Sequence, residues 1–511
     1  MKPTPENFKQ MLVENNELKM KITSLKSENM LLLEKIQYLL NKIFGRSSER
    51  LNPDQLLLAF EELAELQTAL EQTPSEVEAC EDVVLPSKRG KRKPLDAKIP
   101  ENLPVETIVI EPDEVLKNPE LWVKIGEERT EQLDVVPTRF FKRVTIRPKY
   151  KKIKDRSVAP IIAPAPKRLI ENSYASAGLL RHIILSKFCD HLPLYRQEQI
   201  FKQRFGVEIS RKTMGGWMHL MANWLSLIYE ALRSEIQASE YIQADETFIK
   251  YQDPKKDYCP NGYLWAYHSP GVGVLFEWHP SRSAGCLDSM LKGYKGLLQT
   301  DGYIGYTSWL NEAKQIAEKK EIIHAGCWAH ARRKFVESPS TSTNKTIIKY
   351  IATLYRIETT LRENPKLDRY TIRQNKSVPI LQKIKRILDA EKALPKSAYA
   401  KAIKYTLDRW DMLTRYLYHP TLEIDNNLIE NSIRPTAIGK KNWLFFGSPH
   451  SGQDSAILYS LIETCRKLKL NPADYLEELF KALPNMEQNE IKNWTPARWS
   501  HNHKAHFTEH V

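Results

Sequence analysis

Three short acidic motifs contain the residues best suited to chemistry. Asp245 lies in Gln-Ala-Asp-Glu-Thr and Asp301 in Gln-Thr-Asp-Gly-Tyr, each within or after an apolar run typical of a strand. Glu430 lies in Leu-Ile-Glu-Asn, a stretch with helical character. Carboxylates on rigid elements can hold two Mg²⁺ ions about 3.5–4 Å apart, as phosphoryl transfer on nucleic acid requires. We therefore predict that these three acids are catalytic residues and metal ligands.

Each of the three acids also has a structural interpretation. Asp245 could be an edge or capping acid, and Asp301 a turn residue before Gly302. Glu430 could pair with Arg434, four residues along the same helix face. Because an acid inside an apolar strand is costly unless it is paired or liganded, Asp245 is the strongest candidate.

Two neighbouring acids are not expected to be ligands. Glu246 follows Asp245 in an extended strand, so its side chain is predicted to point to the opposite face. Asp425 precedes the helix that carries Glu430 and is expected to cap that helix.

The motif His324-x-x-Cys327-x-x-His330 offers three further ligand types and leads into Arg332 and Arg333. A structural zinc site needs a fourth ligand, and the sequence offers no obvious one, so we do not expect zinc. We predict a hydrogen-bonding role for the motif beside the acidic centre, with the two arginines contacting phosphates.

The acids lie in a mixed α/β region that begins at Tyr241. Five strands are predicted there, the first three as an antiparallel meander: 241–250, 262–268, 272–278, 296–301 and 320–325. Helices are predicted at 283–293, 306–319, 328–337, 426–434, 452–468 and 472–482. Residues 345–418 show only helical patterns and are interpreted as an insertion, and the His-rich tail from Trp494 to Val511 is expected to be poorly ordered.

A leucine heptad occupies the first part of the chain, with Leu18, Leu25, Leu32 and Leu39 at every seventh position. This pattern favours a parallel two-stranded coiled coil and hence a homodimer or higher oligomer. The alternative is one long amphipathic helix packed on the chain's own core.

Two helical stretches, Tyr195–Phe205 and Arg211–Met221, resemble a helix-turn-helix, with Ser210 as the N-cap of the second. Arg211 and Lys212 would then face a groove of double-stranded DNA. An ordinary helical hairpin is the alternative interpretation.

Charge supports a polyanionic partner. The 511 residues carry a net charge of +13, and residues 136–215 hold 18 Lys/Arg against 5 Asp/Glu, which equals the whole excess. The six cysteines show no C-x-x-C spacing, and no apolar run reaches the length of a membrane span, so a soluble cytoplasmic protein associated with the bacterial nucleoid is expected.

The acidic motifs, together with Cys-Trp-Ala-His-Ala-Arg-Arg at 327–333 and Arg434-Pro, resemble the transposases of bacterial insertion sequence sixty-six, the TnpC-type DDE transposases. The likeness covers nearly the full chain and extends through these segments: 44–51, 131–137, 190–196, 441–448 and 471–476. Any one of these motifs is short, but the ordered set is specific.

The resemblance implies a ribonuclease-H-like (retroviral-integrase-like) core with Asp245, Asp301 and Glu430 as its triad. It implies cleavage of element ends and strand transfer into target DNA with Mg²⁺ or Mn²⁺, and accessory proteins from the same element. The residues expected to contact DNA are Arg211, Lys212, Arg332, Arg333, Arg434 and Lys441. A DNA-binding protein that has lost its chemistry and a structure-specific nuclease on the same core are the alternative functions.

One feature departs from the family. Its members usually carry a cysteine-rich zinc-binding module, but residues 116–128 and 148–158 contain no cysteine, so zinc-dependent DNA recognition is not expected here.

The predicted fold is therefore multidomain α+β. Its parts are a coiled coil (1–50), an acidic helix with a basic linker (51–104), a small β-rich module without cysteine (105–165), a helical DNA-binding region (166–238), the α/β core (239–340 and 419–450), a helical insertion (341–418) and C-terminal helices with a tail (451–511).

Overall fold

A computed structural model describes Lys21 and residues 139–150, 161–162, 164–314, 321–339 and 341–507. The predicted coiled coil, the acidic helix with its linker and most of the β-rich module lie outside these residues. Of that module the structure describes one antiparallel pair, β1 (Lys149–Tyr150) with β2 (Ile161–Ile162).

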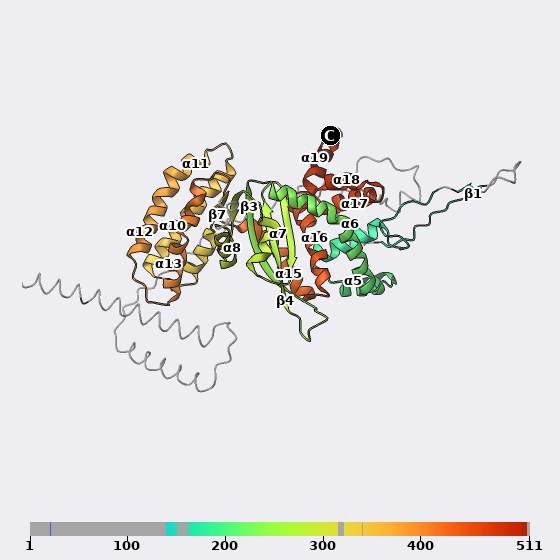
Figure 1. Ribbon diagram of the computed structural model, residues 1–511, viewed down its shortest axis with the longest axis horizontal. Coiled ribbons are helices and arrows are strands. Elements are labelled where there is room, and N and C mark those ends of the chain that lie inside the picture. The colour runs from blue at the N-terminus through green and yellow to red at the C-terminus, as the bar shows by residue number, and fades with distance from the viewer. Residues whose placement is uncertain are drawn as a thin grey trace, which may run out of the picture. The chain divides into compact units, whose positions relative to one another are not determined.

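A mixed sheet forms the centre of the α+β region (Figure 1). Its strands are β3 (Tyr241–Tyr251), β4 (Asn261–Ser269), β5 (Gly273–His279), β6 (Gly296–Gln299) and β7 (Ile322–Ala325). β3, β4 and β5 form the predicted antiparallel meander, while β6 runs parallel to β3 and β7 parallel to β6, giving the order β5-β4-β3-β6-β7. The short β8 (Phe445–Phe446) pairs with the far end of β3. All five predicted strands are confirmed.

The edge strand β5 is covered by α16 (Pro449–Lys467), which packs along it. The backbone N–H groups of Val274 and Phe276 donate to the hydroxyls of Thr464 and Ser460 at 2.9 and 2.8 Å. These bonds satisfy N–H groups of an edge strand that would otherwise be open to pairing with another chain. Helix α16 is therefore part of the core.

Helices α4 (Ala177–Phe188), α5 (Leu194–Phe205) and α6 (Arg211–Gln237) precede the sheet. The Ser210 hydroxyl accepts from the N–H of Thr213 at 3.1 Å, which confirms it as the N-cap of α6. Helix α6 runs much further than the predicted 211–221, because its apolar face stays buried as far as Ile236 and packs on α16 and β5.

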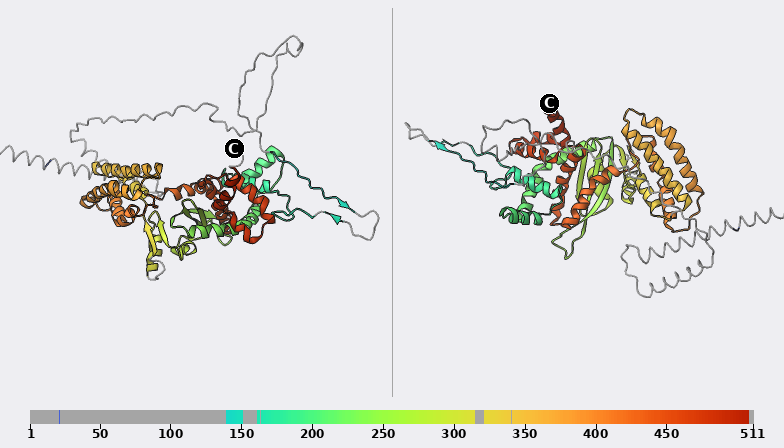
Figure 2. Two further views of the ribbon diagram at one scale, coloured as in Figure 1. Left: turned by 90° about the horizontal axis from the view of Figure 1, so that it is seen from above. Right: turned by 180° about the vertical axis from the view of Figure 1, so that it is seen from behind.

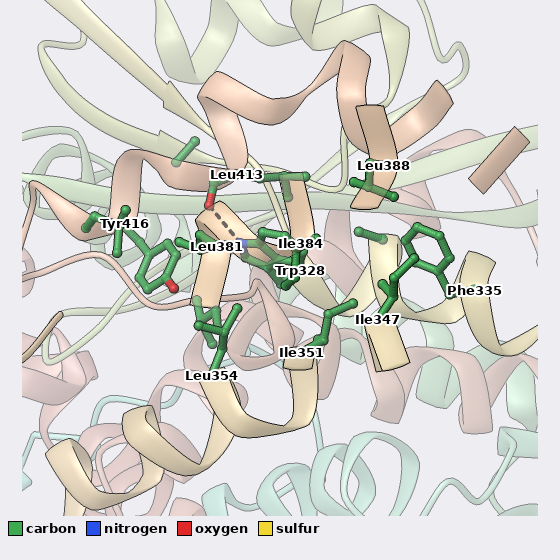
Figure 3. Close-up of a cluster of buried hydrophobic side chains, with 14 of the residues drawn as sticks. Trp328, Phe335, Ile347, Ile351, Leu354, Leu381, Ile384, Leu388, Leu413 and Tyr416 are labelled. Carbon is green, nitrogen blue, oxygen red and sulfur yellow. Dashed lines mark hydrogen bonds between the residues drawn. The ribbon is translucent and has the colours of Figure 1, made fainter. Parts of the chain in front are cut away.

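Residues 342–417 form the helical insertion, which both further views place at one end of the sheet (Figure 2). It comprises α10 (Ser342–Glu363), α11 (Arg369–Ile372), a π-helical turn (Arg373–Ser377), α12 (Val378–Ala390), α13 (Ala398–Asp408), α14 (Trp410–Thr414) and a 3₁₀ turn (Arg415–Leu417). Its apolar core includes Trp328 and Phe335 from α9 (Trp328–Val336), and the Trp328 indole donates to the carbonyl of Leu413 at 2.8 Å (Figure 3). The insertion thus shares one core with a helix of the α/β region.

Three expected helices differ from the structure. The predicted helix 283–293 is a 3₁₀ turn (Ala284–Leu287) followed by the one-turn α7 (Asp288–Leu291). Helix α8 (Ile304–Lys314) begins two residues before the predicted 306–319, whose last five residues lie outside the described part of the chain. The helix around Glu430 extends to Trp443 as α15 (Asn427–Trp443), although Pro435 lies inside it.

The expectation of a poorly ordered tail is wrong as far as Phe507. Helix α17 (Pro472–Ala482) is followed by the short α18 (Gln488–Ile491) and by α19 (Pro496–Phe507). The buried Trp499 anchors α19, because its indole donates to Glu478 at 2.9 Å and its ring contacts Tyr475 edge-on. Within the described residues, no helix is both long enough and apolar enough to cross a membrane.

A fully buried ion pair holds the insertion together. The Arg373 guanidinium binds both carboxylate oxygens of Glu358, at 2.9 and 2.7 Å. It also donates to the carbonyls of Tyr416, His419 and Leu422.

Replacing Arg373 with Met is expected to lower the free energy of unfolding by about 3–5 kcal/mol, because the buried Glu358 carboxylate would lose its bidentate partner and keep only the 3.4 Å contact with Arg369. Lys385→Met, which breaks the exposed Lys385–Asp389 pair, is the control and should cost about 0.5 kcal/mol or less. Urea denaturation of both variants measures the difference, and equal losses would contradict this account.

Candidate active site

Asp245 and Asp301 lie side by side because two parallel strands are in register. Gln243 of β3 pairs with Gln299 of β6, and each aspartate follows its glutamine by two residues. Neighbouring strands are about 4.8 Å apart, and residues i and i+2 of a strand share a face. The repeated Gln-x-Asp spacing therefore brings the two carboxylates to one end of the sheet.

Electrostatics connect Glu430 to this pair. Burial is the main cause that raises the pKa of Asp245 well above its usual range, and the negative charges of Asp301, Glu246 and Glu430 add to the effect. The structure thus brings the three predicted acids within electrostatic range of one another. A cation placed among them would relieve both the desolvation and the repulsion.

A pair of buried glutamines, which we call the glutamine clamp (Gln243 and Gln299), fixes the start of α15. The amide N–H₂ of Gln243 donates to the side chain of Gln299 at 3.0 Å and to the carbonyl of Asp425 at 2.9 Å. Its carbonyl accepts from the backbone N–H of Ile429 at 3.1 Å, in the first turn of α15, and this N–H is shared with the carbonyl of Asn426 at 3.1 Å.

The second member of the glutamine clamp extends the same connection. The amide N–H₂ of Gln299 donates to the carbonyls of Gly326 and Glu423 at 3.0 and 2.8 Å, and its carbonyl also accepts from the Tyr241 hydroxyl. The strands that carry the two aspartates therefore hold the loop and helix start that carry Glu430. Neither glutamine was among the predicted site residues, although the repeated Gln-x-Asp spacing is the signal that could have found them.

The insertion supports the loop of Asp301. The Tyr405 hydroxyl donates to the carbonyl of Asp301 at 2.6 Å, and Arg409 donates to the carbonyl of Gly302 at 3.1 Å. Gly302 has a φ of +85°, a conformation that favours glycine, and a Cβ there would meet the Arg409 side chain.

Glu430 faces α9. One carboxylate oxygen lies 3.7 Å from His330 Nδ1, and the other lies 3.7 Å from the Arg333 guanidinium. The cation beside Glu430 is thus Arg333 from another helix, whereas Arg434 is exposed on α15.

The two acids that were not expected to be ligands, Glu246 and Asp425, bond to other groups, and the N-cap of α15 is Asn426 rather than the expected Asp425. Glu246 accepts from the Arg282 guanidinium at 2.8 Å and from the Tyr306 hydroxyl at 3.0 Å. Asp425 accepts from the backbone N–H of Asn427 at 3.1 Å, at the start of α15.

The His-x-x-Cys-x-x-His motif is divided between two environments. His324 is buried against the Thr300 hydroxyl, 2.9 Å away, and burial, with Arg415 and Arg409, lowers its pKa to about 3. Cys327 and His330 instead gather at Glu430, with one potential ligand atom of each residue within 4.8 Å of the others. The Cys327 sulfur also accepts from the N–H of Asn426 at 3.4 Å.

The basic residues expected to contact DNA are exposed, on three helices. Arg211 and Lys212 begin α6, Arg332 and Arg333 lie on α9, and Arg434 and Lys441 lie on α15. Of these, Arg333 is the one with a contact to a predicted acid. The neighbouring Lys440 donates to the Phe248 carbonyl at 3.0 Å and so joins α15 to β3 beyond the acids.

Gln243→Leu is expected to lower the free energy of unfolding by about 1–3 kcal/mol, because it removes the side-chain donor of the buried Asp425 carbonyl and leaves the Ile429 N–H with the Asn426 carbonyl alone. Gln252→Leu, at an exposed position just after β3, is the matched control and should change it by less than about 0.5 kcal/mol. Chemical denaturation measures the free energy of unfolding of both variants. A Gln243→Leu protein as stable as the control would show that the glutamine clamp does not stabilise the fold.

Asp245→Asn is expected to stabilise the protein in the absence of divalent ions. The pKa of Asp245 is higher in the folded chain than in the unfolded chain, so folding favours the protonated carboxyl group. The free energy of unfolding therefore decreases as the pH rises from the unfolded-state pKa to the folded-state pKa. The melting temperature of the variant should therefore exceed that of the original chain by more at pH 8 than at pH 5.

Glu423→Gln is the control of opposite sign. Despite partial burial, Arg362 and Arg369 lower the pKa of Glu423, so its stabilising effect is present at neutral pH and is lost in acid. This variant should melt below the original chain at pH 8. A destabilised Asp245→Asn protein at pH 8 would contradict the electrostatic account of the site.

Comparison with known proteins places this arrangement in a family. A sequence model described as Transposase IS66 family matches residues 172–454, and a second, described as Transposase C of IS166 homeodomain, matches residues 31–108. Two relatives from Sinorhizobium fredii, both described as uncharacterized, are similar over most of the chain. Protein y4qI is 35% identical over 85% of this chain and 82% of its own length, and protein y4jD is 34% identical over 78% and 81%.

Proposed function

Because the chain belongs to the IS66 transposase family, we propose that it acts in transposition as a DDE transposase, cleaving insertion-sequence ends and joining them to target DNA. The observation that carries the proposal is the half-buried group of Asp245, Asp301 and Glu430, which come from β3, from the loop after β6 and from the start of α15. Such a cluster suits divalent cations better than any other partner.

The donor set fits hard divalent ions, since the charges of Asp301 and Glu430 both act on Asp245 and Glu430 Oε1 is buried without a hydrogen-bond partner. Asp245, Asp301 and Glu430 would hold two Mg²⁺ or Mn²⁺ ions. When bound, such ions activate the attacking oxygen and stabilise the departing 3′-oxygen. The protein's own contribution is to fix the three carboxylates through the glutamine clamp and to keep Asp245 away from bulk water.

The topology supports a ribonuclease-H-like core over 239–340 and 419–450, with 341–418 as an insertion. Three antiparallel strands are followed by two parallel ones, and the acids come from β3, from the loop after β6 and from α15. The last acid can reach the first two only because the chain returns to the sheet after the insertion.

Membership in the family implies DNA binding. We further propose that element ends and target DNA contact Arg332, Arg333, Arg434 and Lys441 near the acids, and that α5 and α6 act as a helix-turn-helix through Arg211 and Lys212. The segment 1–50 would pair two protomers, each holding one end, in the cytoplasm at the bacterial nucleoid. Accessory proteins of the same element would complete the assembly.

Strand transfer with pre-cleaved ends tests the proposal. DNA carrying the inverted repeats that flank the gene is incubated with Mg²⁺ and protein, and joined products are measured. Asp245→Asn, Asp301→Asn and Glu430→Gln should each reduce joining at least about 1,000-fold, since a lost metal ligand removes several kcal/mol of transition-state stabilisation. Binding to the ends should persist.

Asp408→Asn, at an exposed acid on α13, is the control and should join ends normally. Joining that survives Asp245→Asn would overturn the assignment of the triad. Hydrolysis without joining by the original chain would instead indicate a nuclease, and binding without cleavage a DNA-binding protein without chemistry.

A further inference from the structure

Two buried polar atoms face each other beside the acids and have no hydrogen-bond partner. His330 Nδ1 and Glu430 Oε1 lie 3.7 Å apart, and both are shielded from solvent. A hydrogen bond between nitrogen and oxygen spans about 2.7–3.2 Å, so this pair is too far apart to form one. Because buried polar atoms without partners are costly, the separation indicates a group that lies between them.

The Cys327 sulfur is a third potential ligand beside His330 and Glu430. Potential ligand atoms of Cys327, His330 and Glu430 all lie within 4.8 Å of one another. Transition-metal ions bind imidazole nitrogen and carboxylate oxygen at about 2.0–2.2 Å and sulfur at about 2.3 Å, so two ligands of one ion lie about 3–3.7 Å apart. The separation of His330 Nδ1 from Glu430 Oε1 is at the upper end of this range.

Two helix starts hold these ligands in place. Cys327 precedes α9, His330 lies in its first turn, and Glu430 lies at the start of α15. The N–H of Asn426 donates to the Cys327 sulfur at 3.4 Å, and the N–H of Trp328 donates to the carbonyl of Ile424 at 3.2 Å. Ligands positioned by rigid, mutually bonded elements are preorganised for an ion.

Although these two facing atoms are shielded, other parts of the same side chains reach solvent. The His330 and Glu430 side chains are 20% and 27% exposed, whereas Cys327 lies beneath them. Arg333 pairs with the other oxygen of Glu430 and is half exposed, so its guanidinium can leave when a cation arrives.

We propose that His330 Nδ1 and Glu430 Oε1 bind a first-row transition-metal dication, with the Cys327 sulfur as a third and softer ligand. This assignment rests on the proposed function, which it deepens by adding a nitrogen ligand to the carboxylate centre. It also sets the metal preference: imidazole and sulfur suit transition-metal ions, whereas Mg²⁺ prefers oxygen ligands alone. The centre therefore binds Mn²⁺ more tightly than Mg²⁺.

Electron paramagnetic resonance of the full chain loaded with Mn²⁺ tests this directly. The spin echo of bound Mn²⁺ should show coupling to an imidazole ¹⁴N nucleus. His330→Gln should abolish that coupling and weaken Mn²⁺ binding at least about tenfold, since even indirect partners of metal ligands contribute 10–100-fold. Mg²⁺ binding, measured by calorimetry, should change much less.

His324→Gln is the matched control, because it alters the same motif at the histidine that faces Thr300, and it should leave the coupling in place. Absence of nitrogen coupling in the original chain, which does not depend on any variant folding, would overturn the proposal. So would unchanged Mn²⁺ affinity in His330→Gln. The two proposals can fail independently. Strand transfer that survives Asp245→Asn would contradict the proposed function, but it would not change the expected ¹⁴N coupling of bound Mn²⁺.

Discussion

The side-chain amides of Gln243 and Gln299 connect the two strands that lead to the aspartates with the loop and helix start that carry Glu430. They bond to each other across β3 and β6, to the loop before α15 and to the first turn of that helix. A buried amide must satisfy its donors and its acceptor, so it permits few positions for the backbone groups that it binds. Because the register of β3 and β6 positions the two glutamines of the glutamine clamp, it also positions α15, which begins more than a hundred residues later in the chain.

Charge explains why such a rigid support is needed. Asp245 is buried among Asp301, Glu246 and Glu430, an arrangement that destabilises the ion-free protein and raises the pKa of Asp245. Repelling carboxylates would separate if their elements could move. Hydrogen bonds from Tyr405 and Arg409 to the Asp301 loop, and Arg333 beside Glu430, oppose that separation. The same features suit the binding of divalent cations that we propose.

The helical insertion consequently contributes to the site. Its core continues into α9 through Trp328 (Figure 3). Arg373, paired with the buried Glu358, also donates to carbonyls of the chain that returns toward Glu430. Helix α9 carries His330 and has Cys327 as its N-cap, and α13 with the residue that follows it carries Tyr405 and Arg409. The helical insertion, which interrupts the α/β core in the sequence, thus helps to position the acids of that core.

The sequence by itself determined the five strands and the N-cap at Ser210, because period-two apolar patterns and capping chemistry are local signals. The catalytic role of the three acids, which rests on acids beside apolar runs, stays a prediction. The sequence did not determine the glutamine clamp, the separation of His324 from His330, the Arg333 partner of Glu430 or the ordered helix at Trp499. Each of these depends on contacts between residues far apart in the chain, such as Gln243 with Ile429 and Cys327 with Asn426. Only the packing of α9 and α15 against the sheet decides which polar atoms meet.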